Sequence, residues 1–249
     1  FPNVTYGFYK VFAALNGVPY EEIPLREDFS VNVNNYVGLN KTIFIANPNA
    51  PTGLALPLAD VERLVKGNPD SVVVVDEAYV DFGGESALPL IHKYDNLLVT
   101  MTFSKSRSMA GARLGFGAAC KALIADLNAV KYATNPYNVN GMTMAAGIGA
   151  LEDEEYTRAN CRAVMETREI VTAALREMGF ELGDSKANFV FPRHPKIDGR
   201  KLYEELRARG ILVRHFDAPL LARHNRITIG SREQMNRLLD TLGTILEEC

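Results

Sequence analysis

Residues 71–79 read SVVVVDEAY, and this stretch decides the fold. Four consecutive valines lack the apolar–polar alternation of a half-exposed strand and are typical of a strand buried on both faces. Two more short apolar runs, 42–46 (TIFIA) and 96–103 (NLLVTMTF), lie on either side of it in the sequence, with a helical pattern over 58–66 between the first two. This alternation predicts an α/β fold, a mostly parallel sheet covered by helices.

The outer parts of the chain complete this pattern. A helix is expected over 6–16, stopped by Gly17, and one more strand over 113–119, where Gly115 and Gly117 indicate close packing. Residues 153–178 contain few helix breakers and predict one long helix. Beyond it we expect strands over 188–191, 211–214 and 226–229, a helix over 199–209, and a last helix that begins at Ser231 with the S-x-x-Q pattern of a capping box.

The change of pattern near residue 155 predicts two domains. Residues 1–155 form the α/β domain, and residues 156–249 form a smaller α+β domain that the long helix joins to the first.

Composition excludes several classes of function. The 249 residues hold 27 Lys and Arg against 30 Asp and Glu, a net charge of −3, which does not provide the basic surface of a nucleic-acid-binding protein. No apolar run reaches the roughly 18 residues of a membrane span. The three cysteines and four histidines show no metal-ligand spacing, which predicts neither a zinc site nor a disulfide framework and favours the cytoplasm.

Three polar clusters follow the predicted strands directly: NPNAPTG at 47–53, DEAY at 76–79 and SKSRSMAGAR at 104–113. In open α/β sheets, ligands bind beyond the carboxyl ends of the strands, so the three clusters are expected to meet at one site.

Each cluster offers a chemical group that has an ordinary structural explanation when taken alone. Asp76 could cap a turn or hold a positive charge on a ligand. Lys105 could be a surface charge or an amine that forms a Schiff base. The loop after it, with its hydroxyls, its glycine and Arg113, could be an ordinary polar loop or a phosphate site. Together they match the three functional groups of pyridoxal 5′-phosphate that a protein can bind: a ring nitrogen, an aldehyde and a phosphate.

With these motifs the chain resembles the fold-type I, class I/II pyridoxal-phosphate aminotransferases along essentially its whole length. The matching segments are 47–53, 76–79, Ser104-Lys105 and GARLG at 111–115, in that order. TYGFY at 5–9 and RITIG at 226–230 bring it closest to the histidinol-phosphate aminotransferases within that family.

The resemblance implies a role for each matching residue. Lys105, Asp76 and Tyr79 would be catalytic: the Schiff-base lysine, the partner of the pyridine nitrogen and the hydrogen-bond donor to the phenolic oxygen. Tyr6 would stack on the ring, while Ser104 and Arg113 would bind the cofactor phosphate. The residues implied for the substrate are Asn188, Arg214 as the reader of its phosphate and Arg226 as the holder of its acidic group.

The chain departs from the family pattern in two places. Ala50 stands where the family often has an asparagine that donates to the ring oxygen, so either Asn49 takes its place or Tyr79 acts alone. The chain also begins just before Tyr6, without the family's preceding arm, glycine loop and a tyrosine that reaches the neighbouring subunit. The resemblance therefore implies an incomplete large domain, weak binding of the cofactor or none, and slow turnover or none.

The activity implied is transfer of an amino group from L-histidinol phosphate to 2-oxoglutarate by a homodimer, with a small-molecule amino donor and a 2-oxo acid as partners. The alternatives are threonine-phosphate decarboxylation, transamination of other amino acids, or a fragment without catalysis. A nucleotide-binding domain is disfavoured because no G-x-G-x-x-G or G-x-x-x-x-G-K-[ST] occurs.

Overall fold

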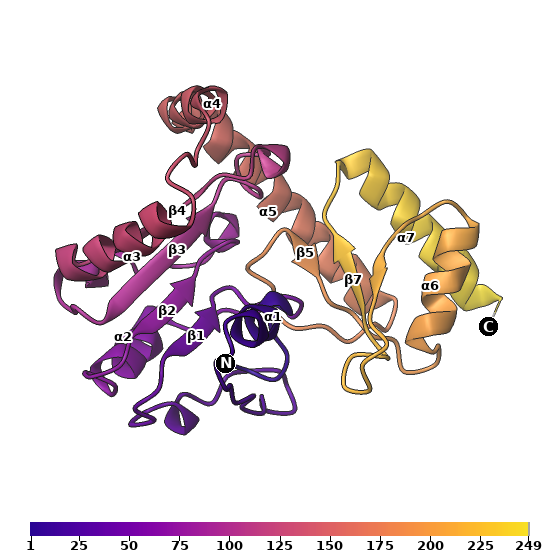
Figure 1. The fold of residues 1–249 in the computed structure, drawn as a ribbon. Coiled ribbons are helices and arrows are strands. Elements are labelled where there is room, and N and C mark those ends of the chain that lie inside the picture. The colour runs from indigo at the N-terminus through magenta and orange to yellow at the C-terminus, as the bar shows by residue number, and fades with distance from the viewer. Residues whose placement is uncertain (249) are drawn as a thin grey trace.

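The computed structural model describes residues 1–248, which fold into two sheets with helices around them (Figure 1). The first sheet has the strand order β1-β2-β3-β4 and the second β5-β7-β6. The strands are β1 (Ile43–Ala46), β2 (Val73–Asp76), β3 (Leu97–Thr102), β4 (Gly115–Ala119), β5 (Phe189–Val190), β6 (Arg214–His215) and β7 (Asn225–Thr228). The α-helices are α1 (Phe8–Leu15), α2 (Leu58–Lys66), α3 (Lys121–Thr134), α4 (Gly141–Glu152), α5 (Glu154–Glu177), α6 (Gly199–Ala208) and α7 (Arg232–Glu247). Short 3₁₀ turns cover Val33–Asn35, Val80–Phe82, Leu88–His92 and Ala110–Ala112.

The first sheet is the mostly parallel sheet expected from the valine run. β1, β2 and β3 pair in parallel, whereas β4 runs antiparallel to β3. All three valines of β2 are buried, which confirms that this strand is covered on both faces. At Gly115 an added Cβ would lie 2.7 Å from the backbone oxygen of Met101, so the predicted close packing is also confirmed there.

Side-chain alternation divides the two faces of this sheet. Val73 and Val75 point with the odd-numbered residues of β1 and β3 into an apolar core that α2 closes through Leu64 and Val65. Asp76 follows the even-numbered residues and lies on the other face, beside Phe44 of β1, over which the ring of Tyr9 from α1 packs at 5.4 Å.

The second sheet covers the second apolar core. Its buried residues Val190 and Ile227 pack with Val171 and Leu175 of α5 and with the apolar faces of α6 and α7. α7 begins as predicted: the Ser231 hydroxyl accepts from the Gln234 amide at 3.2 Å, and the Gln234 side chain accepts from the Ser231 amide at 2.9 Å.

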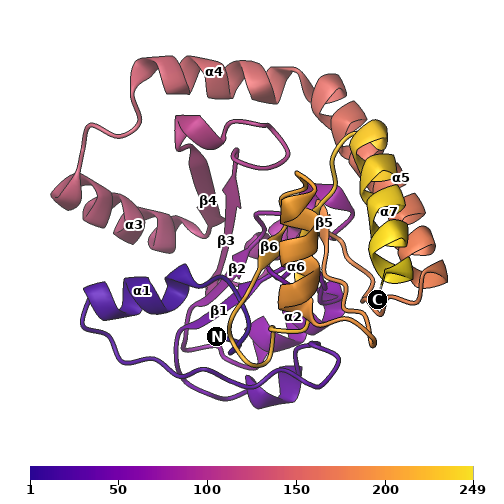
Figure 2. The ribbon, with the colours of Figure 1, turned by 90° about the vertical axis from the view of Figure 1, so that its right-hand side faces the viewer.

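Two expectations from the sequence were wrong. The strand expected over 211–214 lies at Arg214–His215 instead, because the Ile211 amide donates back to Leu206 at 2.9 Å and ends α6. No helix was expected over 121–152, where the structure has α3 and α4 on the β4 side of the first sheet (Figure 2). α3 has no buried residue, and Tyr132, Tyr137 and Met142 are largely exposed in this region.

Helix α5 lies between the two sheets (Figure 1) and carries one buried guanidinium. Arg168 donates from one nitrogen to the carbonyl of Phe82, which follows β2, and to the carbonyl of Ala187, which precedes β5, at 2.7 Å each. Burial lowers the pKa of this guanidinium because its charged form loses contact with water. The hydrogen bonds to the two carbonyls offset part of this desolvation cost.

We expect Arg168→Met to lower the free energy of unfolding by about 2–4 kcal/mol, because two buried carbonyls lose their donor. Urea denaturation of the purified chain measures this difference. Arg162→Met is the matched control, since Arg162 is an exposed arginine of the same helix, and its effect should stay within about 0.5 kcal/mol. Equal losses for the two variants would contradict a joining role for Arg168.

Candidate active site

The parallel strands bring their carboxyl ends to one edge of the first sheet. Ala46, Asp76 and Thr100 are neighbours in the register of β1, β2 and β3. The segments 47–53, 76–79 and 104–113 all leave this edge or lie just beyond it, as the sequence predicted. The register of the strands alone therefore brings these three segments close together.

Asp76 is the charged group at the centre of this edge. Its Oδ2 accepts from the Tyr9 hydroxyl at 2.8 Å, and its Oδ1 accepts from the Ala78 amide at 3.2 Å. Burial raises the pKa of Asp76, whereas the two hydrogen bonds and the positive charge of Lys105 act in the opposite direction. A carboxylate in this setting gains from a further positive partner.

Lys105 lies two residues beyond Phe103, where the buried part of this segment ends. Its ammonium is 5.3 Å from the centre of the Tyr79 ring, so the two catalytic candidates of the loops are brought together. The Tyr79 hydroxyl has no hydrogen-bond partner among residues 1–248 and remains available to a ligand.

A row of rings and cations connects this edge to the second sheet. The Tyr79 ring meets the Phe189 ring of β5 edge-on at 5.1 Å, and the guanidinium carbon of Arg226 also lies 5.1 Å from the centre of Phe189. The Nε of Arg226 is buried and has no hydrogen-bond partner in the described chain. This nitrogen therefore keeps a hydrogen that a bound acceptor could take.

Arg214 and Arg226 lie directly opposite each other on β6 and β7. Cross-strand partners point to the same face of a sheet, where like charges destabilise the pairing. Within residues 1–248 neither guanidinium forms an ion pair with a carboxylate. The pair is suited to a ligand with one or more acidic groups.

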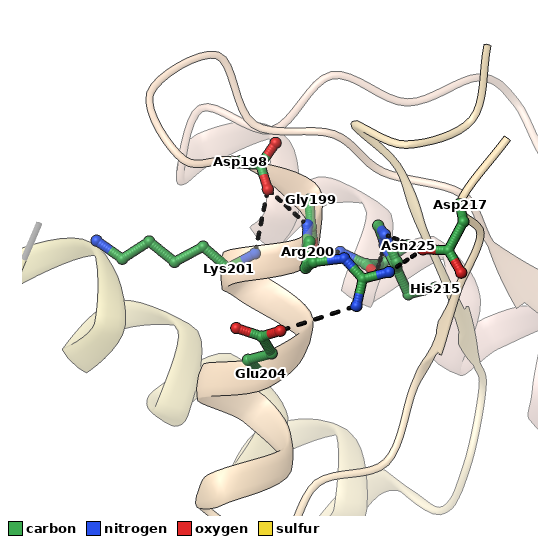
Figure 3. A network of polar contacts seen from close by, with 8 residues as sticks. All are labelled: Asp198, Gly199, Arg200, Lys201, Glu204, His215, Asp217 and Asn225. Carbon is green, nitrogen blue, oxygen red and sulfur yellow. Dashed lines mark hydrogen bonds and ion pairs between the residues drawn. The ribbon is translucent and has the colours of Figure 1, made fainter. Parts of the chain in front are cut away.

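The neighbouring residues hold this pair of strands in place (Figure 3). Asn225 is fully buried; its amide donates to the Gly199 carbonyl at 2.8 Å and its oxygen lies 3.1 Å from Nδ1 of His215. Asp198 caps α6 through the amides of Arg200 and Lys201, and Arg200 forms an ion pair with Asp217 after β6. These contacts fix the register that places the two arginines face to face.

The loop over 104–113 has two kinds of residues. Ser106 donates to Asp81, and Arg107 donates to the Ala150 carbonyl at 2.7 Å, so both are engaged within the fold. Ser104 accepts from the Thr102 hydroxyl at 2.9 Å, and exposed Arg113 donates to the Ala110 carbonyl at 2.8 Å. The last two retain donors that could bind a phosphate.

The remaining predicted residues lie at different distances from this row. Asn188 directly precedes Phe189, and its side chain has no hydrogen bond in the described chain. Tyr6 is about half exposed and meets the Tyr9 ring edge-on at 5.5 Å. Asn49 is buried and engaged within the fold: its amide donates to Val4 and Thr52 and its oxygen accepts from Thr5. Its amide is thus not free for the ring oxygen for which it was proposed.

Two residues of this site were missed in the sequence. Tyr9 contacts Asp76 across 67 positions, and only its spacing of three from Tyr6 on a helix could have suggested it. Phe189 was expected as part of a strand, and no signal marks it as the ring between Tyr79 and Arg226.

Comparison with known proteins identifies the family. The model of the family described as aminotransferase class I and II matches residues 1–242. The chain belongs to this family. The resemblance drawn from 47–53, 76–79 and 104–115 is thereby confirmed.

Relatives and solved structures of aminotransferases extend this result. Histidinol-phosphate aminotransferase 2 of Dechloromonas aromatica is 50% identical over 246 residues, which cover 98% of this chain and 69% of the relative. The structure of histidinol-phosphate aminotransferase from Sinorhizobium meliloti in complex with pyridoxal-5′-phosphate has a TM-score of 0.88 at 24% identity, over 99% of this chain and 69% of that one. L-threonine-O-3-phosphate decarboxylase from Porphyromonas gingivalis has the same fold, with a TM-score of 0.81 at 24% identity over 99% and 76%.

Residues 1–248 contain no group of three or more His, Cys, Asp or Glu side chains placed to hold a metal ion. None of the helices in that range is long and apolar enough to span a bilayer.

The buried carboxyl next to Asp76 predicts a pH dependence of stability in this aminotransferase. Burial raises the pKa of Glu77, although the Ser86 hydroxyl and the Ala87 amide donate to it at 2.6 and 2.5 Å. Because the pKa of Glu77 is raised in the folded state, its contribution to stability is complete at pH values below its unfolded pKa near 4. This contribution is lost as the pH rises through its folded pKa.

Glu77→Gln should therefore make the free energy of unfolding fall less steeply as the pH rises above about 4. Urea denaturation at a series of pH values measures the slope. Glu85→Gln, which changes an exposed glutamate nearby, serves as the control and should leave the slope unchanged. A wild-type slope in Glu77→Gln would contradict the assignment.

Proposed function

We propose that this aminotransferase uses pyridoxal 5′-phosphate to transfer the amino group of L-histidinol phosphate to 2-oxoglutarate. The observation that carries the proposal is the pair Arg214 and Arg226, two guanidinium groups that face each other and form no ion pair with a carboxylate. Ring contacts through Phe189 and Tyr79 connect Arg226 to Lys105. The two substrates carry a phosphate and two carboxylates, respectively, and require such a pair. The 50% identity to a histidinol-phosphate aminotransferase supports the same donor.

The residues of the site fit the cofactor. A buried carboxylate with spare acceptor capacity, an amine beside an aromatic ring and a loop with free donors match a ring nitrogen, an aldehyde and a phosphate. The buried Nε of Arg226, which has no hydrogen-bond partner in the described chain, supports the binding of an acidic substrate group there.

Each residue has one role in this mechanism. When bound, pyridoxal phosphate supplies an aldehyde that joins to an amine and a ring that withdraws electrons from the substrate carbon. Asp76 holds a proton on the ring nitrogen, and Tyr79 donates to the ring's phenolic oxygen. Lys105 would hold the aldehyde carbon through Nζ, and as a free amine it would move the proton from the substrate carbon to the cofactor.

The other residues bind and orient. Ser104 and Arg113 hold the cofactor phosphate, and Tyr6 covers the ring. Arg226 binds the carboxylate of 2-oxoglutarate, Arg214 binds the phosphate of the donor, and Asn188 lines the substrate site. Asn49 is left out of this set because its amide is engaged with Val4 and Thr52.

We also propose a cytoplasmic homodimer. Exposed apolar side chains on α3 and α4, including Val130 and Met142, support the contact with a second copy. Cys120 and Cys161 are free thiols, which supports a reducing compartment.

Lys105 provides the direct test of the function. Purified chain incubated with excess pyridoxal phosphate, histidinol phosphate and 2-oxoglutarate should form glutamate, and Lys105→Ala should lower the rate by about a thousandfold, because the amine is the acceptor of the proton. Lys121→Ala, an exposed lysine of α3, is the control and should retain activity. Borohydride reduction followed by peptide mapping should place the pyridoxyl group on Lys105, and an adduct on another lysine would overturn the role.

The alternative donor is threonine O-phosphate, which the shared fold with a decarboxylase of that substrate favours as the runner-up. Decarboxylation releases carbon dioxide and needs no 2-oxo acid. Carbon dioxide release without glutamate formation would replace the proposed reaction with this one.

Arg214→Ala should raise KM for histidinol phosphate by about ten- to a hundredfold, because a charge-assisted hydrogen bond to the phosphate contributes about 1.5–3 kcal/mol. The KM for unphosphorylated histidinol should stay the same. Steady-state kinetics with both donors make the comparison, and Arg207→Ala, an exposed arginine of α6, should change neither value. Equal losses for both donors would remove Arg214 as the phosphate-binding residue.

A further inference from the structure

The closest side-chain partner of Asp76 is a tyrosine to which no role is assigned above. Tyr9 of α1 is 7% exposed, and its hydroxyl donates to Oδ2 of Asp76 at 2.8 Å. The Phe1, Tyr6 and Phe44 rings surround it at 5.4–5.8 Å. The ring is therefore held in position independently of the hydrogen bond.

The direction of this hydrogen bond is fixed by chemistry. Burial and the nearby Asp76 carboxylate raise the pKa of Tyr9, so its hydroxyl stays protonated across the physiological range and acts as a donor. A donor stabilises a carboxylate more than a carboxylic acid, because the charged oxygen is the stronger acceptor.

The surroundings of Asp76 show why such a donor matters. Burial by itself favours the neutral acid. Against this act the Ala78 amide, the Lys105 charge and Tyr9, of which Tyr9 has the largest opposing effect. A neutral Asp76 could not hold a proton on a ring nitrogen by charge.

We propose that Tyr9 is a positioning residue, which keeps Asp76 an oriented anion for the ring nitrogen of pyridoxal phosphate. This inference rests on the proposed function for its purpose, but the Tyr9–Asp76 interaction is testable without the cofactor. A further tyrosine, Tyr36, provides the matched control. It is 1% exposed, and its hydroxyl has no hydrogen-bond partner among residues 1–248.

The first test follows the Asp76 carboxyl in the cofactor-free chain. Protein labelled with ¹³C at the aspartate carboxyl carbon is titrated by NMR, and the spectrum of Asp76→Asn identifies the Asp76 signal. Tyr9→Phe should move the Asp76 titration to higher pH, whereas Tyr36→Phe should leave it in place. An unchanged titration in Tyr9→Phe would overturn the proposal.

A second variant protects this test against misfolding of Tyr9→Phe. With ¹³C at the tyrosine Cζ, the Tyr9 signal should shift in Asp76→Asn, because the charged acceptor is gone, and the Tyr36 signal should not. A Tyr9 signal that does not respond to Asp76→Asn would show that the hydrogen bond is not formed.

The link to the cofactor is tested by binding. Tyr9→Phe should weaken the binding of pyridoxal phosphate most at low pH, where Asp76 is neutralised more readily, by about tenfold for each pH unit that its titration moves up, and the visible absorption of the bound cofactor should change its pH dependence. Tyr36→Phe should bind like wild type. Equal affinity and an equal pH dependence in Tyr9→Phe would overturn the positioning role. Failure of the wild-type chain to bind the cofactor would instead contradict the proposed function, and the NMR titration would then decide whether Tyr9 acts on Asp76.

Discussion

The site depends on one constraint: β2 is a central strand of parallel neighbours and is apolar on both faces until its last residue. Three buried valines bring the chain to Asp76 with no polar side chain before it. Because β1 and β3 run in the same direction and in register, the segments that follow them emerge beside that carboxylate. The same sheet therefore buries the Asp76 carboxylate and places the segments that contact it beside it.

The sequence predicted the local features of this arrangement and missed the distant ones. The valine run, the helix over 58–66 and the Ser231 capping box depend on neighbours in the chain, so their patterns are visible in it. α3 and α4 were not expected because α3 buries no residue and α4 few, which leaves no apolar stripe set against a polar face. The position of β6 was predicted wrongly because the apolar residues before it follow the end of α6, where the Ile211 amide donates back to Leu206, and do not pair in the sheet.

The site follows the same division. Lys105, Asp76 and Tyr79 follow strands closely, and the order of the strands was sufficient to expect them together. The Tyr9–Asp76 hydrogen bond and the ring of Phe189 arise from packing between segments far apart in the chain, and no periodicity records such contacts. Asn49 illustrates the reverse case: its type suits a ligand, but its amide and oxygen are engaged with Val4, Thr52 and Thr5.

Arg168 has a consequence for movement between the two halves of the site. Its guanidinium nitrogen is 2.7 Å from both the Phe82 and the Ala187 carbonyl oxygen, and such bonds weaken beyond about 3.2 Å. While both bonds persist, the segment leading to Phe189 and Arg226 can slide past the first sheet by only about half an ångström. A larger separation of the Phe82 and Ala187 carbonyls therefore has to break at least one of these two bonds.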